Sequence, residues 1–90
     1  MNSAWTIEVS AAAERQLAKL DRIVARRVTR FLLERVAGAA DPRAIGKPLQ
    51  GNMDEYWSFR IGDYRVICEI HDHRVVVVVI DVEHRSKVYR

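Results

Sequence analysis

Four side chains in the C-terminal half of the chain have the chemistry to handle a phosphate group. Arg60 and Arg65 flank a Gly-Asp turn at residues 62–63, and Arg85 and Tyr89 follow the last β-prone run. A guanidinium group offers fixed donors to phosphate oxygens as charge develops during transfer. A phenol can orient a hydroxyl, stack on a base or move a proton. If the C-terminal tail crosses the strand that carries Arg65, we expect Arg65, Arg85 and Tyr89 to converge on one site. The alternative is that they form salt bridges with the nearby acidic residues Asp63, Asp81 and Glu83.

Three predicted strands position these arginines. Two β-rich runs are separated by the Gly62-Asp63 turn, and the next two by Asp72-His73, which is the pattern of an antiparallel meander. Residues 75–80 form an unbroken apolar run with five valines, which predicts an interior strand covered on both faces. Alternation along residues 65–70 places Arg65 on the face opposite Cys68.

The N-terminal half predicts one further strand and two helices. Residues 5–9 alternate apolar and polar side chains and are β-prone, so we expect a strand of the same sheet. Ser10 and Asp21 are suitable N-caps for two helices with apolar stripes, which form a helical hairpin covering the valine-rich strand. We therefore expect an α+β fold, with the N-terminal strand and the hairpin packed on the meander, in a single domain spanning residues 1–90. The segment around Lys47 is expected to be a loop.

Composition limits the class of protein and its location. Apolar residues make up 49% and charged residues 30% of the chain, which is ordinary for a globular protein. No apolar run approaches the length of a membrane span, and the N-terminus lacks the pattern of a signal peptide, so we expect a cytoplasmic protein without membrane contact. The one cysteine, Cys68, is expected to be a small core residue.

The second predicted helix carries a stripe of arginines. Arg22, Arg26 and Arg30 recur every four residues and share one helix face. Residues 1–53 hold nine Lys/Arg against five Asp/Glu, so the helical half is the basic one. The stripe is either a solvated face or a surface for phosphates or an acidic partner.

Several reaction classes lose support because their motifs are missing from the sequence. It contains no HxxH, HExxH or CxxC spacing, no glycine-rich phosphate loop and no convincing Ser/His/Asp set. His71, His73 and His84 are spread over a turn and the tail, so we expect neither a metal site nor a cofactor.

Two motifs resemble the RelE/ParE family of toxins from bacterial type II toxin–antitoxin modules. The first is W-x-x-R-x-G-x-Y-R in the meander, and the second is H-R-x-x-V-Y at the C-terminus. Around them, the order of strand, helical hairpin, a Lys-Pro-Leu segment and a valine-rich strand is also similar to that family. The similarity covers nearly the whole chain and implies the RelE-like microbial RNase fold.

For the RelE branch, the resemblance implies an endoribonuclease, or mRNA interferase, that enters the ribosomal A site, cuts the mRNA codon there, inhibits translation and arrests growth. The 2′-hydroxyl of the RNA attacks the adjacent phosphate without a metal, leaving a cyclic phosphate and a 5′-hydroxyl. By position, the catalytic residues would be Arg65, Arg85 and Tyr89. Arg65 would stabilise the transferring phosphate, and Arg85 would aid the leaving group or stabilise charge. Tyr89 would orient or activate the nucleophile or stack on a base. Residues holding RNA would be Lys47, Arg60 and Lys87.

One departure from the RelE pattern leaves the general base unassigned. RelE enzymes carry lysines in the strand before the glycine turn, whereas Trp57, Ser58 and Phe59 occupy that segment here and Arg60 is its cation. Arginine is a poor general base because it hardly deprotonates. Two alternatives therefore stay open: a ParE-like inhibitor of DNA gyrase without nuclease activity, and a protein that mainly binds its antitoxin as a co-repressor.

The resemblance also implies partners. The first is a cognate, helical, RelB-like antitoxin, which we expect to contact Arg22, Arg26 and Arg30. The nuclease function adds the ribosomal A site with its mRNA. Operator DNA is expected to bind only through the antitoxin complex.

Overall fold

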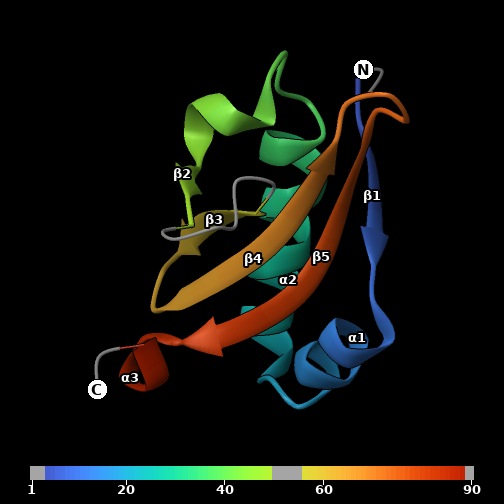
Figure 1. Ribbon diagram of the computed structural model, residues 1–90. Coiled ribbons are helices and arrows are strands. Elements are labelled where there is room, and N and C mark those ends of the chain that lie inside the picture. Colours follow the sequence, from blue (N-terminus) through green and yellow to red (C-terminus); the bar gives the residue numbers. More distant parts are fainter. Residues whose placement is uncertain (1–3, 50–55, 89–90) are drawn as a thin grey trace.

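The computed structural model describes residues 4–49 and 56–88 of the chain. Figure 1 shows a twisted sheet with helices on one side of it. The elements in chain order are β1 (Thr6–Val9), α1 (Ala11–Ala18), α2 (Arg22–Arg30), the π-helical segment η1 (Phe31–Val36), the 3₁₀ turn η2 (Pro42–Ile45), β2 (Lys47–Pro48), β3 (Tyr56–Ile61), β4 (Tyr64–His71), β5 (Val76–His84) and α3 (Arg85–Val88).

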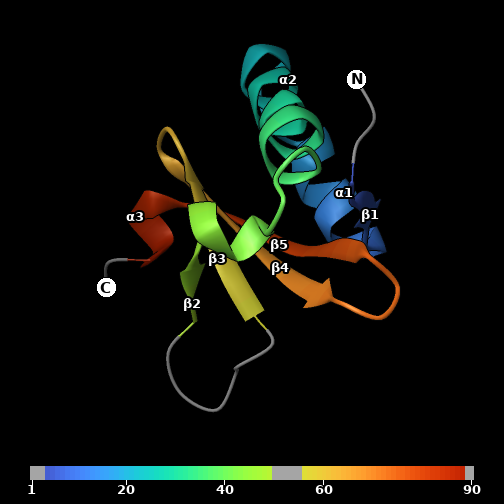
Figure 2. The same ribbon diagram turned by 90° about the horizontal axis from the view of Figure 1, so that it is seen from above.

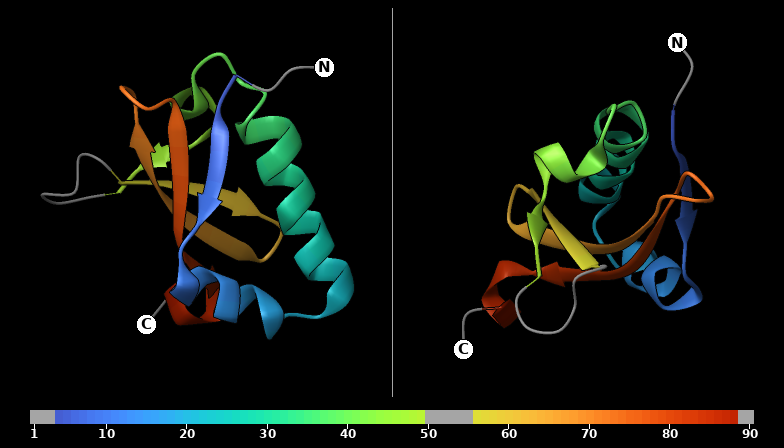
Figure 3. Two further views of the ribbon diagram at one scale, coloured as in Figure 1. Left: turned by 90° about the vertical axis from the view of Figure 1, so that its right-hand side faces the viewer. Right: turned by 45° about the horizontal axis from the view of Figure 1, so that its top comes forward.

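The sheet has the strand order β1-β5-β4-β3-β2. Strands β3, β4 and β5 form the predicted antiparallel meander. Strand β5 lies inside the sheet as predicted, between β1 and β4. It is not fully covered on both faces, because Val77 and Val79 lie in the core whereas Val78 is only half-buried. Strand β1 runs parallel to β5, with Thr6 opposite Val76 and Val9 opposite Val79, so the sheet is mixed. Figure 3 shows β1 alongside β5. The predicted α+β class is confirmed.

The two predicted helices begin at their predicted caps. The Ser10 hydroxyl accepts a hydrogen bond from the Ala13 amide at 3.1 Å, and the Asp21 carboxylate accepts one from the Ile23 amide at 3.1 Å. Figure 2 shows α1 and α2 on the same side of the sheet. Their apolar side chains meet the inner sheet face in a core that includes Ala13, Val28, Leu32, Val36, Phe59, Val66, Cys68, Val77 and Val79.

A β-bulge in β5 decides which side chains share the outer sheet face with Arg65. The partner of Ile67 is Asp81, whereas the partner of Cys68 is Val79, so Ile80 has no direct partner on β4. This extra residue interrupts the alternation along β5. As a result, both Val79 and Val82 lie in the core, and Glu83 is placed directly opposite Arg65.

Helix α1 completes the edge of β5 beyond the end of β1. The pairing with β1 stops at Val79, which leaves the following part of β5 without a strand neighbour on that side. There the Gln16 side chain accepts a hydrogen bond from the Val82 amide at 2.9 Å and donates one to the Asp81 carboxylate at 2.6 Å. The Gln16 side chain therefore holds both the edge of β5 and the carboxylate of Asp81, which lies next to Glu83.

The predictions for two connecting segments were wrong. The second turn of the meander is longer than Asp72-His73, because it extends through Val75, which has a φ of 54° and lies outside β5. The segment around Lys47 is a short strand and not a loop, because Lys47 and Pro48 pair with Ser58 and Trp57. Within the two described stretches, no helix is long and apolar enough to cross a membrane.

Candidate active site

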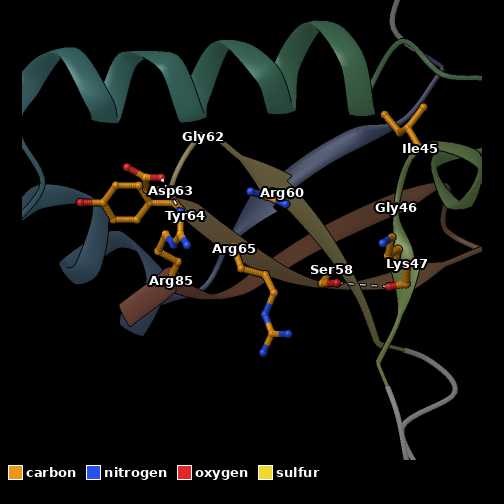
Figure 4. Close-up of a pocket in the computed structure, with 10 residues that line it drawn as sticks. All are labelled: Ile45, Gly46, Lys47, Ser58, Arg60, Gly62, Asp63, Tyr64, Arg65 and Arg85. Atoms are coloured by element: carbon orange, nitrogen blue, oxygen red, sulfur yellow. Dashed lines mark hydrogen bonds and ion pairs between the residues drawn. The ribbon is translucent and has the colours of Figure 1, made fainter. Parts of the chain in front are cut away.

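A cleft of about 290 Å³ opens beside the β3–β4 turn (Figure 4). Strands β2, β3 and β4 and the start of α3 contribute to it, so four separate parts of the chain meet there. Its lining residues are Ile45, Gly46, Lys47, Ser58, Arg60, Gly62, Asp63, Tyr64, Arg65 and Arg85. The predicted convergence of Arg65 with Arg85 is therefore present in the structure.

Arg65 lies between a cation and an acid on neighbouring strands. It is directly opposite Arg60 on β3 and directly opposite Glu83 on β5. Its Nη2 atom lies 3.5 Å from Oε1 of Glu83, a long contact for an ion pair. Its Nε atom is buried and has no hydrogen-bond partner within the described residues. Because the side chain is still 37% exposed, Arg65 retains donors that an incoming anion can use.

Arg85 is held at the cleft by the β3–β4 turn. Its amide donates a 2.7 Å hydrogen bond to the Asp63 carbonyl oxygen, and its guanidinium Nη1 lies 3.7 Å from the Asp63 carboxylate. The side chain of Arg85 is 57% exposed. The predicted salt bridges to Asp63 and Glu83 thus exist, but such long and exposed pairs contribute about 0–1 kcal/mol each. They leave both guanidinium groups accessible.

The remaining predicted RNA-binding residues form the rim of the cleft. Lys47 and Arg60 are both exposed, and both line the cleft. The Ser58 hydroxyl donates a 3.4 Å hydrogen bond to the Lys47 carbonyl oxygen, which joins β2 to β3 (Figure 4). The predicted catalytic residue Tyr89 and the side chain of Lys87 lie outside the described part of the structure.

The fold also brings together two aromatic rings whose contact the sequence did not predict. Tyr64 lines the cleft, and its ring packs edge-on against His84, with the centroids 5.1 Å apart and an interplanar angle of 82°. Nδ1 of His84 accepts a hydrogen bond from the Ser86 amide at 3.1 Å, so Nε2 carries the proton in the neutral ring. The H-R-x-x-V-Y motif contained this histidine, but its contact with Tyr64 depends on strand pairing.

An acidic pair next to Arg65 was likewise not predicted as part of the site. Hydrogen bonding with Asp81, together with partial burial, raises the pKa of Glu83, while the Arg65 guanidinium opposes this effect. The sequence predicts both carboxylates only as alternative salt-bridge partners of the arginines. The position of Glu83 directly opposite Arg65 depends on the bulge at Ile80, which no sequence pattern indicates.

The predicted antitoxin-binding arginines lie away from the cleft, on α2. Arg26 and Arg30 line a depression of about 630 Å³ between the helix and the β3–β4 turn, and Arg60 lines both this depression and the cleft. Arg22 lies with Arg26 and Arg30 along a second depression of about 470 Å³ on the other side of the helix. Within both depressions, Glu34 is the acidic lining residue, and it pairs loosely with Arg30 at 4.0 Å.

Comparisons with known proteins agree with the fold. A family model described as the ParE toxin of the type II toxin–antitoxin system parDE matches residues 7–89. Toxin RelG of Mycobacterium tuberculosis is 31% identical over 86 residues, covering 96% of this chain and 97% of the relative. Toxin RelE of the same organism is 32% identical over 86 residues, covering 96% and 87%.

A solved structure gives the same result for the fold. The toxin–antitoxin complex RelBE2 from Mycobacterium tuberculosis contains a chain that superposes with a TM-score of 0.83 at 29% identity, covering 96% of this chain and 97% of that chain. The fold is thus that of the RelE-like toxins. The chain belongs to the RelE/ParE family of toxins from type II toxin–antitoxin systems.

Proposed function

We propose that this toxin is a ribosome-dependent endoribonuclease that cleaves mRNA codons in the A site by metal-independent attack of the RNA 2′-hydroxyl. The observation that carries this proposal is the cleft that both Arg65 and Arg85 line, with the Arg65 side chain 37% exposed. An anion-binding cleft built from two guanidinium groups is suited to a phosphate whose charge increases during transfer.

Each cation has a separate role in this mechanism. Arg65 donates to the non-bridging oxygens of the scissile phosphate through its exposed Nη groups, which present fixed donors to the phosphate oxygens. Arg85, which Asp63 holds at the other side of the cleft, stabilises charge on the departing 5′-oxygen. Lys47 and Arg60 bind the flanking phosphates from the rim. Tyr89 is assigned to the nucleophile by family resemblance alone.

The partner proposed for this toxin is a helical, RelB-like antitoxin. The toxin relative in the RelBE2 structure was solved as a toxin–antitoxin complex. In this chain, the arginine stripe Arg22, Arg26 and Arg30 is exposed between two depressions, next to the exposed apolar side chains Ile23 and Leu33. An amphipathic helix with acidic residues beside its apolar face complements such a surface. Operator DNA is proposed to bind only through this complex.

A second function is favoured by two specific observations. The matching family model is that of ParE, and the strand segment that carries lysines in RelE enzymes carries Trp57, Ser58 and Phe59 here. Under this alternative the toxin binds DNA gyrase and cuts no RNA. The nuclease and the gyrase inhibitor share this fold, so fold similarity does not distinguish the two functions.

The test is primer extension on a reporter mRNA after brief induction of the toxin without antitoxin. Wild-type toxin is expected to generate new 5′ ends in the translated region, and Arg65→Ala is expected to abolish them. The matched control is Arg74→Ala, which removes an arginine that pairs with Glu8 at 3.2 Å and does not line the cleft. Growth arrest with intact mRNA would refute the nuclease, and a gyrase supercoiling assay would then test the alternative.

A further inference from the structure

The proposed cleavage requires a group that removes the proton from the attacking 2′-hydroxyl. Arginine is unsuited to this step because it hardly deprotonates. Lys47 belongs to β2, which is separated from the Arg65 strand by β3. Glu83 lies directly opposite Arg65, and its Oε1 atom lies 3.5 Å from Nη2 of Arg65. Glu83 does not itself line the cleft, but its carboxylate adjoins the phosphate-binding arginine, so an RNA phosphate bound to Arg65 would bring the adjoining ribose towards it.

We propose that Glu83 is the general base of the reaction. The inference rests on the nuclease function proposed above. In the reaction step, the 2′-oxygen forms a bond to phosphorus as its proton passes to the Glu83 carboxylate. The bond between phosphorus and the 5′-oxygen breaks, and the 5′-oxygen takes a proton from water. Glu83 then releases its proton to solvent, so the step requires no oxidant, reductant or metal.

The tertiary structure provides three conditions that this role requires. Glu83 is held in place by strand pairing with β4, directly opposite Arg65. Its side chain is 34% exposed, so substrate and solvent can reach it. Asp81 is fixed in turn by the Gln16 amide at 2.6 Å, which keeps the second carboxylate beside Glu83. The base is therefore positioned before substrate binds.

The electrostatic surroundings of Glu83 also fit a base. The groups that face it are Asp81 on its own strand, Arg65 on β4 with Arg60 beyond it on β3, and the neutral Gln16 amide of α1 next to Asp81. Asp81 raises the pKa of Glu83, and Arg65 opposes this effect. A carboxylate with a raised pKa is a stronger proton acceptor while it stays ionised at neutral pH. When the RNA phosphate engages Arg65, the opposing effect on Glu83 weakens.

The test is a single-turnover cleavage assay on ribosomes with a defined A-site codon, measured from about pH 5 to pH 9. The wild-type rate is expected to rise with pH and then level off as Glu83 ionises. Glu83→Gln should lower the rate by about 10²-fold or more, the range for loss of a general base. It should also remove the rise of the rate with pH, which is the acidic limb of the profile. Glu83→Asp should keep the limb at a reduced rate. In Asp81→Asn the limb should move to lower pH, because the group that raises the pKa of Glu83 is gone.

Controls separate this role from a structural one. Glu69→Gln is the matched variant, because Glu69 lies on β4 near the far end of the meander and pairs with His71 at 2.9 Å. It should retain the wild-type rate and pH profile. Antitoxin affinity and thermal unfolding of Glu83→Gln verify that the variant is folded.

Three results would overturn the inference, and they are distinguishable. If Glu83→Gln cleaves as fast as wild type or faster with the acidic limb intact, Glu83 only neutralises Arg65. If Glu83→Gln misfolds, an unmoved limb in Asp81→Asn excludes Glu83 as the base instead. If wild-type toxin cleaves no RNA on ribosomes at any pH, the proposed function fails and the inference fails with it.

Discussion

Arg60 and Arg65 lie directly opposite each other on β3 and β4, so two guanidinium groups share one cross-strand position at the cleft. Like charges in this arrangement destabilise a sheet by about 0.2–1 kcal/mol. Glu83, on the other side of Arg65, offsets part of this repulsion. Under the proposed function, the phosphates of bound RNA would neutralise both guanidinium groups.

Replacing Arg60 should improve stability and weaken RNA binding. Arg60→Thr removes the like-charge pair and introduces a good strand former, so the free energy of unfolding should rise by up to about 1 kcal/mol. Affinity for RNA should fall, and the slope of log K against log salt should decrease by about 0.7–1, because one phosphate contact is lost. Urea denaturation and a salt titration of RNA binding measure both effects. Arg74→Thr, the control, should leave RNA binding unchanged. Reduced stability in Arg60→Thr would contradict the expected repulsion.

Gln16 should be important for stability although it belongs to a short helix. Gln16→Leu removes both of its hydrogen bonds and leaves the Val82 amide unpaired at the edge of β5. The expected loss is about 1–3 kcal/mol, the cost of an unsatisfied polar group in a partly buried position. Chemical denaturation measures this loss. Arg15→Ala, at the exposed neighbouring position, should change stability by no more than about 0.5 kcal/mol.

The turn before β5 contains a strained residue. Val75 adopts a φ of 54°, a conformation that β-branched side chains rarely tolerate, and it is 41% exposed. Val75→Asn should raise the free energy of unfolding by about 1 kcal/mol, because asparagine accepts this conformation more readily. Thermal unfolding tests this prediction.

The reciprocal change at the other meander turn should destabilise the protein. Gly62 has a φ of 59°, and a Cβ atom there would lie 3.1 Å from the Arg27 guanidinium. Gly62→Ala should therefore cost about 1–2 kcal/mol, chiefly through the backbone conformation. If both variants shifted stability in the same direction, the left-handed geometry could not be the cause.

Cys68 should be unreactive in the folded protein. Burial raises the pKa of its thiol to about 12, whereas an unfolded thiol titrates near about 8.5. At pH 8, Ellman's reagent should label native protein slowly and urea-unfolded protein rapidly. Since the folded pKa is the higher one, the stabilisation is complete below about pH 8.5 and is lost as pH rises toward 12. Cys68→Ala should lack this loss, and rapid labelling of the native protein would contradict the burial.

The sequence by itself determined the local features of this protein. Ser10 and Asp21 were predicted as helix caps because their side chains satisfy amides within the next three residues, which requires no tertiary contact. The glycine turn at Gly62 followed from turn chemistry. The placement of Arg65 and Cys68 on opposite faces of the sheet followed from the two-residue period of a strand. The family followed from two short motifs, and the predicted meeting of Arg65 with Arg85 was correct.

Only the tertiary structure decided which carboxylates lie beside the arginines. Uninterrupted pairing along β5 would have given Arg65 a different partner, but the extra residue Ile80 shifts the register and brings Glu83 opposite it. A bulge adds one unpaired residue, and an unbroken run of valines contains no signal for its position. The parallel pairing of β1 with β5 ends at Val79, so the next part of the β5 edge has no strand neighbour on that side. The Gln16 side chain accepts a hydrogen bond from the Val82 amide there. Such contacts between residues distant in the chain depend on which strands become neighbours, and that is decided by packing of the whole core.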